Sequence, residues 1–195
     1  MKIYCATSNP GKLREFRLAG EVLGIDIEPL AELKSIPAPE ENGATFEENA
    51  RLKASYYSRF APGPLCADDS GLAVDALGGE PGVYSARYAG PHATDQANNR
   101  LLLERLGDER NRTARFVCVI ALAEGGEVRQ TFRGEVEGEI LREARGPGGF
   151  GYDPLFYYPP FGRSFGEVDG PEKFEVSHRG KALRALLKSL TGSKR

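Results

Sequence analysis

A strong hairpin signal lies in the second half of the chain and limits the folds that the chain can adopt. Two strand-like segments, residues 115–124 and 127–135, flank the pair Gly125 and Gly126. A two-residue glycine connection of this kind is typical of a tight β-hairpin. The chain is therefore expected to contain a pair of antiparallel strands.

Around this hairpin, helical and strand patterns alternate. Thr45 and Glu48 form a capping box that opens one helix, and Asn9 followed by Pro10 is typical of another helix start. Strands are predicted at residues 2–6 and 65–67, and helices at 13–23, 45–59, 94–106 and 179–190. Residues 28–42 are expected to be mostly loop or an irregular edge, and loops are predicted at 78–90 and 146–170. The alternation predicts an α/β fold with a mixed sheet flanked by helices, in two lobes with an active-site cleft between them. At 195 residues the chain is expected to be one such two-lobed domain, residues 1–195.

Composition narrows the class of protein. The 26 basic residues nearly balance the 28 acidic ones, for a net charge of -2, so neither a nucleic acid nor a membrane is expected as the main partner. No apolar stretch approaches the ~20 residues of a membrane span, and Met1 leads directly into a strand pattern, so a cytoplasmic location is expected. Cys5, Cys66 and Cys118 are interpreted as reduced, buried thiols, and with two histidines a zinc cluster lacks ligands.

Two adjacent aspartates, Asp68 and Asp69, follow a short apolar strand and precede Ser70 and Gly71. Carboxylate oxygens suit Mg²⁺, and one of the pair could act as a general base on water. Because successive strand side chains point to opposite faces, both reach one ion only if the backbone turns here, as Gly71 would permit. The alternative is that the pair simply caps a turn.

Two upstream segments could bind phosphate. Residues 8–12 offer backbone N–H groups at a helix start together with Lys12, although an ordinary capped helix is an equal alternative. Lys53 lies on the helix begun by Thr45, where it reaches either a phosphate or solvent. Glu40 and Glu41 could supply a metal carboxylate or be solvated loop charges.

Two downstream segments could bind a base. Glycines on both sides of Phe150 allow a flat ligand to approach the ring, and Asp153 can accept hydrogen bonds from a base. Lys173, His178 and Arg179 carry donors suited to carbonyl oxygens, unless they form only a capped helix start and a surface charge pair. Nucleophilic catalysis by a serine is not expected, because no nucleophile-elbow pattern surrounds Ser70.

In order along the chain, these segments closely resemble the inosine triphosphate pyrophosphatase family, which removes non-standard purine nucleotides. The matching motifs are TSNPGK at 7–12, EENG at 40–43, TFEENARLKA at 45–54, ADDSGL at 67–72, PGVYSARYAG at 81–90, GGFGYDPLF at 148–156 and SHRGKAL at 177–183. The similarity covers nearly the whole chain.

The resemblance implies a curved mixed sheet in two lobes, a homodimer, and Mg²⁺-dependent hydrolysis of ITP, dITP or XTP to the monophosphate and pyrophosphate. It implies Asp69 as base and metal ligand, with Asp68 and either Glu40 or Glu41 assisting. The implied substrate-binding residues are Thr7, Ser8, Asn9, Pro10, Gly11, Lys12, Lys53, Ser70, Phe150, Gly151, Tyr152, Asp153, Lys173, His178 and Arg179.

Two rival functions stay open at this point: a related pyrophosphatase with another base specificity, and a catalytically silent nucleotide sensor. Joint retention of Asp68, Asp69, Lys12 and Lys53 disfavours the sensor. Donors that face a 6-oxo group would be left unpaired by the 6-amino group of adenine. Guanine must be excluded at its 2-amino edge.

Overall fold

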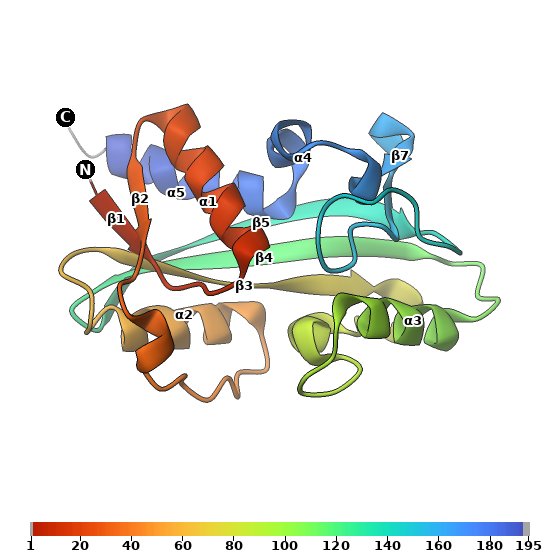
Figure 1. Cartoon of the computed structure of the whole chain (residues 1–195), viewed down its shortest axis with the longest axis horizontal. Helices are drawn as coiled ribbons and strands as arrows, with labels where there is room; N and C mark the ends of the chain where they lie inside the picture. Colours follow the sequence, from red (N-terminus) through yellow and green to blue (C-terminus); the bar gives the residue numbers. More distant parts are fainter. Residues whose placement is uncertain (1, 193–195) are drawn as a thin grey trace. The chain divides into compact units, whose positions relative to one another are not determined.

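The computed structural model describes residues 2–192 and has a mixed α/β fold (Figure 1). Within that range one seven-stranded sheet has the order β2-β1-β3-β4-β5-β6-β7. Its strands are β1 (Lys2–Cys5), β2 (Asp26–Pro29), β3 (Leu65–Val74), β4 (Thr113–Glu124), β5 (Glu127–Ile140), β6 (Phe156–Tyr158) and β7 (Arg163–Ser164).

The strand pairing confirms the predicted mixed sheet. Strand β1 is parallel to both β2 and β3, whereas β6 is antiparallel to both β5 and β7. Strands β4 and β5 form the predicted hairpin, in which Gly125 and Gly126 have φ values of 58° and 93°. Positive φ at both turn residues matches the twist of a tight hairpin, which explains the need for glycine there.

The helices lie close to the predicted ranges. They are α1 (Pro10–Leu23), α2 (Phe46–Tyr57), α3 (Asp95–Leu106), α4 (Gly170–Val176) and α5 (His178–Gly192), and short 3₁₀ turns occupy Leu33–Ser35, Asp75–Leu77, Gly82–Arg87, Pro159–Phe161 and Phe165–Glu167. Asn9 caps α1 with Pro10 as its first residue, and the capping box of Thr45 and Glu48 begins α2. Side-chain caps satisfy N–H groups that no helical carbonyl can reach. Both helix starts were therefore predictable from residues close to them in the sequence.

The predicted pattern was wrong in three places. Strand β3 runs ten residues, to Val74, instead of ending before the aspartates. The loop predicted at 146–170 contains β6 and β7. Helix α4 also follows that loop without having been predicted, although Asp169 caps it with an ordinary N-cap hydrogen bond. The segment 28–42, predicted as mostly loop or an irregular edge, begins with the end of the edge strand β2, which agrees with that prediction.

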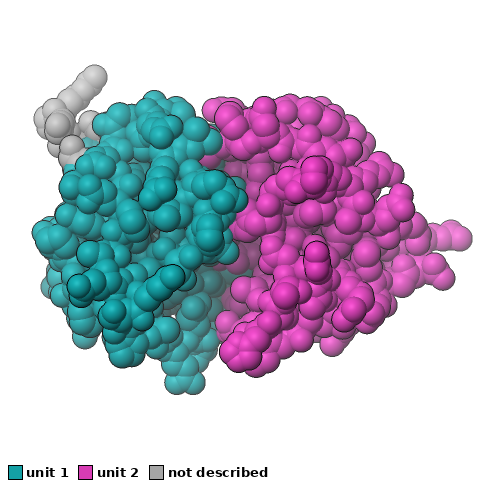
Figure 2. Space-filling model, viewed as in Figure 1, with its two compact units in different colours: residues 1–69, 118–134, 178–195 teal, residues 70–117, 135–177 magenta. Residues whose placement is uncertain are grey.

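The chain divides into two compact units, coloured separately in Figure 2. Unit 1 comprises residues 1–69, 118–134 and 178–195, and unit 2 comprises residues 70–117 and 135–177. The predicted single two-lobed domain and the cleft between lobes stay predictions.

In unit 1, α1 and α5 lie on one face of the sheet and α2 lies on the other (Figure 1). Small side chains such as Ala50 and Ala54 let α2 pack closely on β3 and β4. The buried residues of this core are Leu30, Ala50, Ala54, Tyr57, Leu65, Ala67, Val119, Ala121 and Ala123. All three cysteines are free and buried, as predicted.

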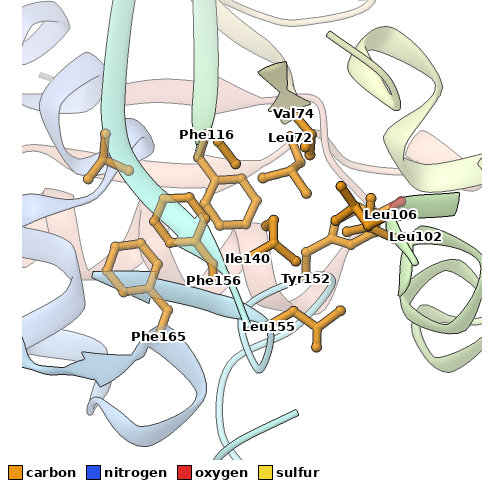
Figure 3. Packing of buried hydrophobic residues seen from close by; sticks show 12 residues of the cluster. Leu72, Val74, Leu102, Leu106, Phe116, Ile140, Tyr152, Leu155, Phe156 and Phe165 are labelled. Atoms are coloured by element: carbon orange, nitrogen blue, oxygen red, sulfur yellow. The ribbon is translucent and has the colours of Figure 1, made fainter. Parts of the chain in front are cut away.

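Unit 2 has a core that is rich in aromatic rings (Figure 3). The ring centroids of Phe116 and Phe156 lie 4.5 Å apart, and those of Phe156 and Phe165 lie 5.0 Å apart. Leu102 and Leu106 bring α3 onto this cluster. Large interlocking rings bury much apolar surface, so the loops that carry β6 and β7 are held by a packed core. Within residues 2–192, no helix combines the length and apolar character of a membrane span.

Candidate functional site

Asp68 and Asp69 are interior residues of β3, and their side chains have separate sets of partners. The turn at Gly71 that both side chains would need to reach one ion is absent, since the strand continues for three further residues. In an extended strand, neighbouring side chains point to opposite faces. The two carboxylates therefore lie on opposite faces of the sheet of unit 1, where α1 and α5 cover one face and α2 covers the other (Figure 1).

The Asp68 carboxylate lies among cations from α1 and α5. Its Oδ2 lies 2.9 Å from Lys12 Nζ and 3.3 Å from Arg179 Nη2. Arg179 also forms an ion pair with Glu15 of α1, a buried carboxylate that sequence reasoning missed. Asp68 and Arg179 are 4% and 2% exposed, so this network is screened from water.

The charges of this network stabilise one another. Burial disfavours the charged form of Asp68, but Lys12 and Arg179 outweigh burial and hold the pKa of its carboxyl well below the ordinary range. Burial likewise opposes the charge on Arg179, and Glu15 and Asp68 outweigh it and raise the guanidinium pKa. Asp68 thus keeps its negative charge, which makes it a poor proton acceptor.

The Asp69 carboxylate has a different arrangement on the α2 face. Lys53 Nζ lies 2.8 Å from Asp69 Oδ1 and 2.9 Å from Glu41 Oε2. The Nδ2 of Asn49 donates to Asp69 Oδ2 at 3.3 Å. One lysine therefore lies between two carboxylates, and an uncharged amide holds the second oxygen of Asp69.

Burial dominates the electrostatics of Asp69. It raises the pKa of the Asp69 carboxyl, and the nearby Lys53 offsets this effect only in part. Burial also opposes the charge of Lys53, but Asp69 and Glu41 outweigh it and raise the lysine pKa. Asp69 is consequently the better proton acceptor of the two aspartates, because its affinity for a proton is increased.

The geometry distinguishes Glu41 from Glu40. Glu41 shares Lys53 with Asp69, whereas Glu40 is exposed and lines a shallow groove with Leu52 and Tyr56. Within residues 2–192, no three His, Cys, Asp or Glu side chains gather into a ready-made metal cluster. Two carboxylates around one cation still fit Mg²⁺, which typically takes one or two carboxylates and completes its shell with water and phosphate oxygens.

Asn49 is a candidate site residue that the sequence reasoning did not identify. It is 1% exposed, and besides Asp69 it contacts Gly43: its Oδ1 accepts from Gly43 N at 2.9 Å, and its Nδ2 donates to Gly43 O at 3.4 Å. Asn49 thereby ties the segment after Glu41 to the Asp69 side of β3. The signal was its position four residues before Lys53, which places both side chains on the same face of a helix.

Residues 7–12 form the predicted loop and helix start of α1. The N–H groups of Gly11 and Lys12 are, however, bound by Asn9 Oδ1 at 2.8 and 3.1 Å. The Asn9 cap therefore satisfies the two N–H groups that were expected to be open to phosphate. Thr7 accepts a hydrogen bond from Asn9 N, and Ser8 and Pro10 are exposed.

The residues expected to read the base form a cluster in unit 2. Lys173 Nζ lies 2.6 Å from Asp153 Oδ2 and 4.7 Å from the centroid of the Phe150 ring. Asp153 Oδ2 also accepts from Phe150 N at 2.8 Å. Both Lys173 and Asp153 are buried, and the lysine also lies over the ring of Phe165. A buried cation and carboxylate are thus held beside a half-buried aromatic ring.

The remaining predicted residues have other environments. Tyr152 is 4% exposed, packs in the core of unit 2 and donates from its hydroxyl to Ser85 O at 2.8 Å. Ser70 is half-buried in β3. His178 is buried at the start of α5 in unit 1, where Gly134 of β5 comes so close that an added Cβ would lie 2.1 Å from His178 O. A side chain at position 134 would displace this helix start.

Comparison with known proteins gives one consistent result. The family model described as the Ham1 family matches residues 3–189. The chain is 53% identical over 193 residues to the dITP/XTP pyrophosphatase of Thermus thermophilus, covering 97% of this chain and 91% of that protein. It is 50% identical over 186 residues to the dITP/XTP pyrophosphatase of an Exiguobacterium species, covering 95% of each.

The fold agrees with these matches. A HAM1 protein structure from Coxiella burnetii superposes with a TM-score of 0.88 at 44% identity, over 98% of this chain and 99% of that one. A match along almost the whole chain, in both sequence and structure, leaves one assignment: this protein belongs to the Ham1 family.

Proposed function

We propose that this protein hydrolyses non-standard purine nucleoside triphosphates, namely ITP, dITP and XTP, to the monophosphate and pyrophosphate. The similar proteins from Thermus thermophilus and Exiguobacterium carry the name dITP/XTP pyrophosphatase. The observation that carries the proposal is the arrangement in which Lys53 lies between Glu41 and Asp69. Such an arrangement can orient a water molecule, accept its proton and bind phosphate oxygens within one small region.

In this proposal Asp69 is the general base. Its raised pKa increases its affinity for the proton of an attacking water, while Asn49 and Lys53 fix one oxygen each. A base that is already oriented loses little freedom on reaching the transition state. Asp68 keeps its charge between Lys12 and Arg179 and supports the geometry from the other face of β3.

The phosphate chain is proposed to bind Lys12 and Lys53. Both ammonium groups now pair with carboxylates, and phosphate oxygens can share their remaining N–H donors. Glu41 and Asp69 are the residues that would hold Mg²⁺, and Glu41 is favoured over Glu40 because only Glu41 shares the lysine with Asp69. When bound, the ion would offset negative charge on the phosphates.

Base recognition is proposed to rest on the ring of Phe150 and the pair of Asp153 and Lys173. A stacked base would lie on an aromatic face, and the charged pair offers both an acceptor and donors for its edge. His178 and Arg179 are kept as candidates for the base carbonyls, although Arg179 is now engaged by Glu15 and Asp68. A homodimeric state and a cytoplasmic location are further parts of this proposal.

A substrate panel tests the proposal directly. Purified protein with Mg²⁺ is expected to release pyrophosphate from ITP and XTP far faster than from ATP or GTP, with Asp69→Asn as the matched inactive control. Equal rates on all four would support a pyrophosphatase of broader specificity. Tight ITP binding without turnover, with or without Mg²⁺, would support the nucleotide sensor instead.

A further inference from the structure

Two side chains of α3 hold the glycine in the middle of the proposed base-recognition loop. Asp95 Oδ2 accepts from Gly151 N at 2.7 Å, and Asn99 Nδ2 donates to Gly151 O at 3.0 Å. Asp95 and Asn99 are four residues apart, so they lie on the same face of the helix. The two hydrogen bonds hold the peptide groups on both sides of Gly151.

Gly151 belongs to a loop with an unusual backbone. Gly149 and Gly151 have φ values of 75° and 62°, which disfavour any other residue. At Gly149, an added Cβ would also lie 2.3 Å from Asp153 Oδ2. This tight path brings Phe150 N onto the Asp153 carboxylate, so a shift of the Gly151 peptides would move both groups that are proposed to meet the base.

The chemistry of each contact explains the residue type. Gly151 O can only accept, so the residue that binds it must donate, as the amide of Asn99 does. Gly151 N can only donate, and Asp95 supplies an acceptor. Asp95 is also the first residue of α3, where a negative charge suits the helix dipole. That role alone would leave its carboxylate in solvent, whereas it is directed onto Gly151.

We propose that Asp95 and Asn99 are positioning residues for base recognition, which act by fixing Gly151 so that Phe150 and Asp153 keep the geometry that a purine requires. This inference rests on the proposed function. It assigns to α3 a part in substrate specificity and none in the chemistry at the phosphates.

The test compares ligands that contain a base with one that does not. In Asp95→Ala and Asn99→Ala, the KM for ITP is expected to rise about 5- to 10-fold, the loss of one hydrogen bond, with kcat within about 2-fold. The affinity for IMP, measured by calorimetry, is expected to fall by a similar factor. Inhibition by inorganic triphosphate, which lacks a base, is expected to stay unchanged.

Conservative variants separate positioning from a general effect of charge or stability. Asp95→Asn keeps an oxygen acceptor for Gly151 N and is expected to retain wild-type IMP affinity. Asn99→Asp offers no donor to Gly151 O and is expected to bind IMP no better than Asn99→Ala. If Asp95 acted only through the helix dipole, Asp95→Asn would behave like Asp95→Ala.

Asn98 provides a matched control on the same helix. It is 3% exposed. Its side-chain oxygen accepts from Ala89 N and its Nδ2 donates to Ala86 O, away from the loop. Asn98→Ala is expected to lower the melting temperature without changing the ratio of IMP affinity to inorganic triphosphate affinity.

Unchanged IMP affinity in both alanine variants would overturn the inference, and so would an equal loss of IMP and triphosphate binding. Failure of the proposed function gives a different result: wild-type protein that does not hydrolyse ITP. Selective weakening of IMP in the variants would then still support the role of α3 in holding a base.

Discussion

The two faces of β3 place neighbouring aspartates in contrasting environments. Asp68 lies between two cations, Lys12 and Arg179, and has a lowered pKa. Asp69 shares the cation Lys53 with Glu41 and has a raised pKa. The residue type is the same and both side chains are buried, so the neighbouring charges set the difference in pKa. A strand that alternates its side chains can therefore give adjacent carboxylates opposite tasks.

The largest effect is expected from Asp69→Asn. This change removes the proposed base and keeps the shape of the side chain, with one oxygen left to accept from Lys53 or Asn49. Turnover of ITP is expected to fall about 1000-fold, within the range for loss of a general base, while nucleotide binding persists. Steady-state kinetics and calorimetry measure the two quantities. A variant that stays active would show that Asp69 is not the base.

Asp68→Asn is expected to act mainly on stability. It leaves the buried Arg179 and the neighbouring Lys12 without a negative partner on β3, and breaking a buried ion pair costs about 3 kcal/mol in the free energy of unfolding. Urea unfolding measures this change. Asp69→Asn is expected to lose less stability, because burial already disfavours the charged form of Asp69. The contrast between the two faces would fail if both variants lost equal stability.

Asn49→Ala tests whether Asn49 positions the Asp69 carboxylate. Loss of the amide frees one oxygen of Asp69 and releases Gly43, so kcat is expected to fall about 10-fold with little change in KM. Asn49→Asp keeps the shorter loop contact, the acceptor for Gly43 N, and removes the donor to Asp69 together with the longer contact to Gly43 O. If Asn49 only anchored the loop, Asn49→Asp would restore kcat, whereas the positioning role predicts that it does not.

The smallest effect concerns pH. A carboxyl whose pKa is lower in the folded than in the unfolded state stabilises the fold above its unfolded pKa, and the stabilisation is lost as pH falls through the folded pKa. Asp68 is such a group, so wild-type stability is expected to drop by about 1 kcal/mol per pH unit below about pH 4.

The two aspartates are expected to differ in this titration. Asp68→Asn should flatten the acid limb of the free energy of unfolding, measured by urea titration at successive pH values. Asp69→Asn should leave the limb as steep or make it steeper, because a raised folded pKa acts in the opposite sense. A flattened limb in Asp69→Asn alone would reverse the assignment of the two environments.

The features that depend on neighbouring residues were predictable from the sequence. Asn9 with Pro10, Thr45 with Glu48, and the pair Gly125 and Gly126 set two helix starts and a hairpin through contacts within a few residues. The order of the motifs was sufficient to indicate the family, which the comparisons confirmed.

How those motifs meet depends on the packing of the whole fold. The predicted strand ended before Asp68 and Asp69, because aspartate is disfavoured in strands. Packing by α1, α2 and α5 and pairing with lysines keep both residues inside β3. Long-range contacts also decided that Glu41 pairs with Lys53, that the amide of Asn49 reaches Asp69, and that Asp95 and Asn99 bind Gly151. These contacts join residues between 12 and 56 positions apart. Contacts over such separations depend on how elements pack, and no local pattern encodes that packing.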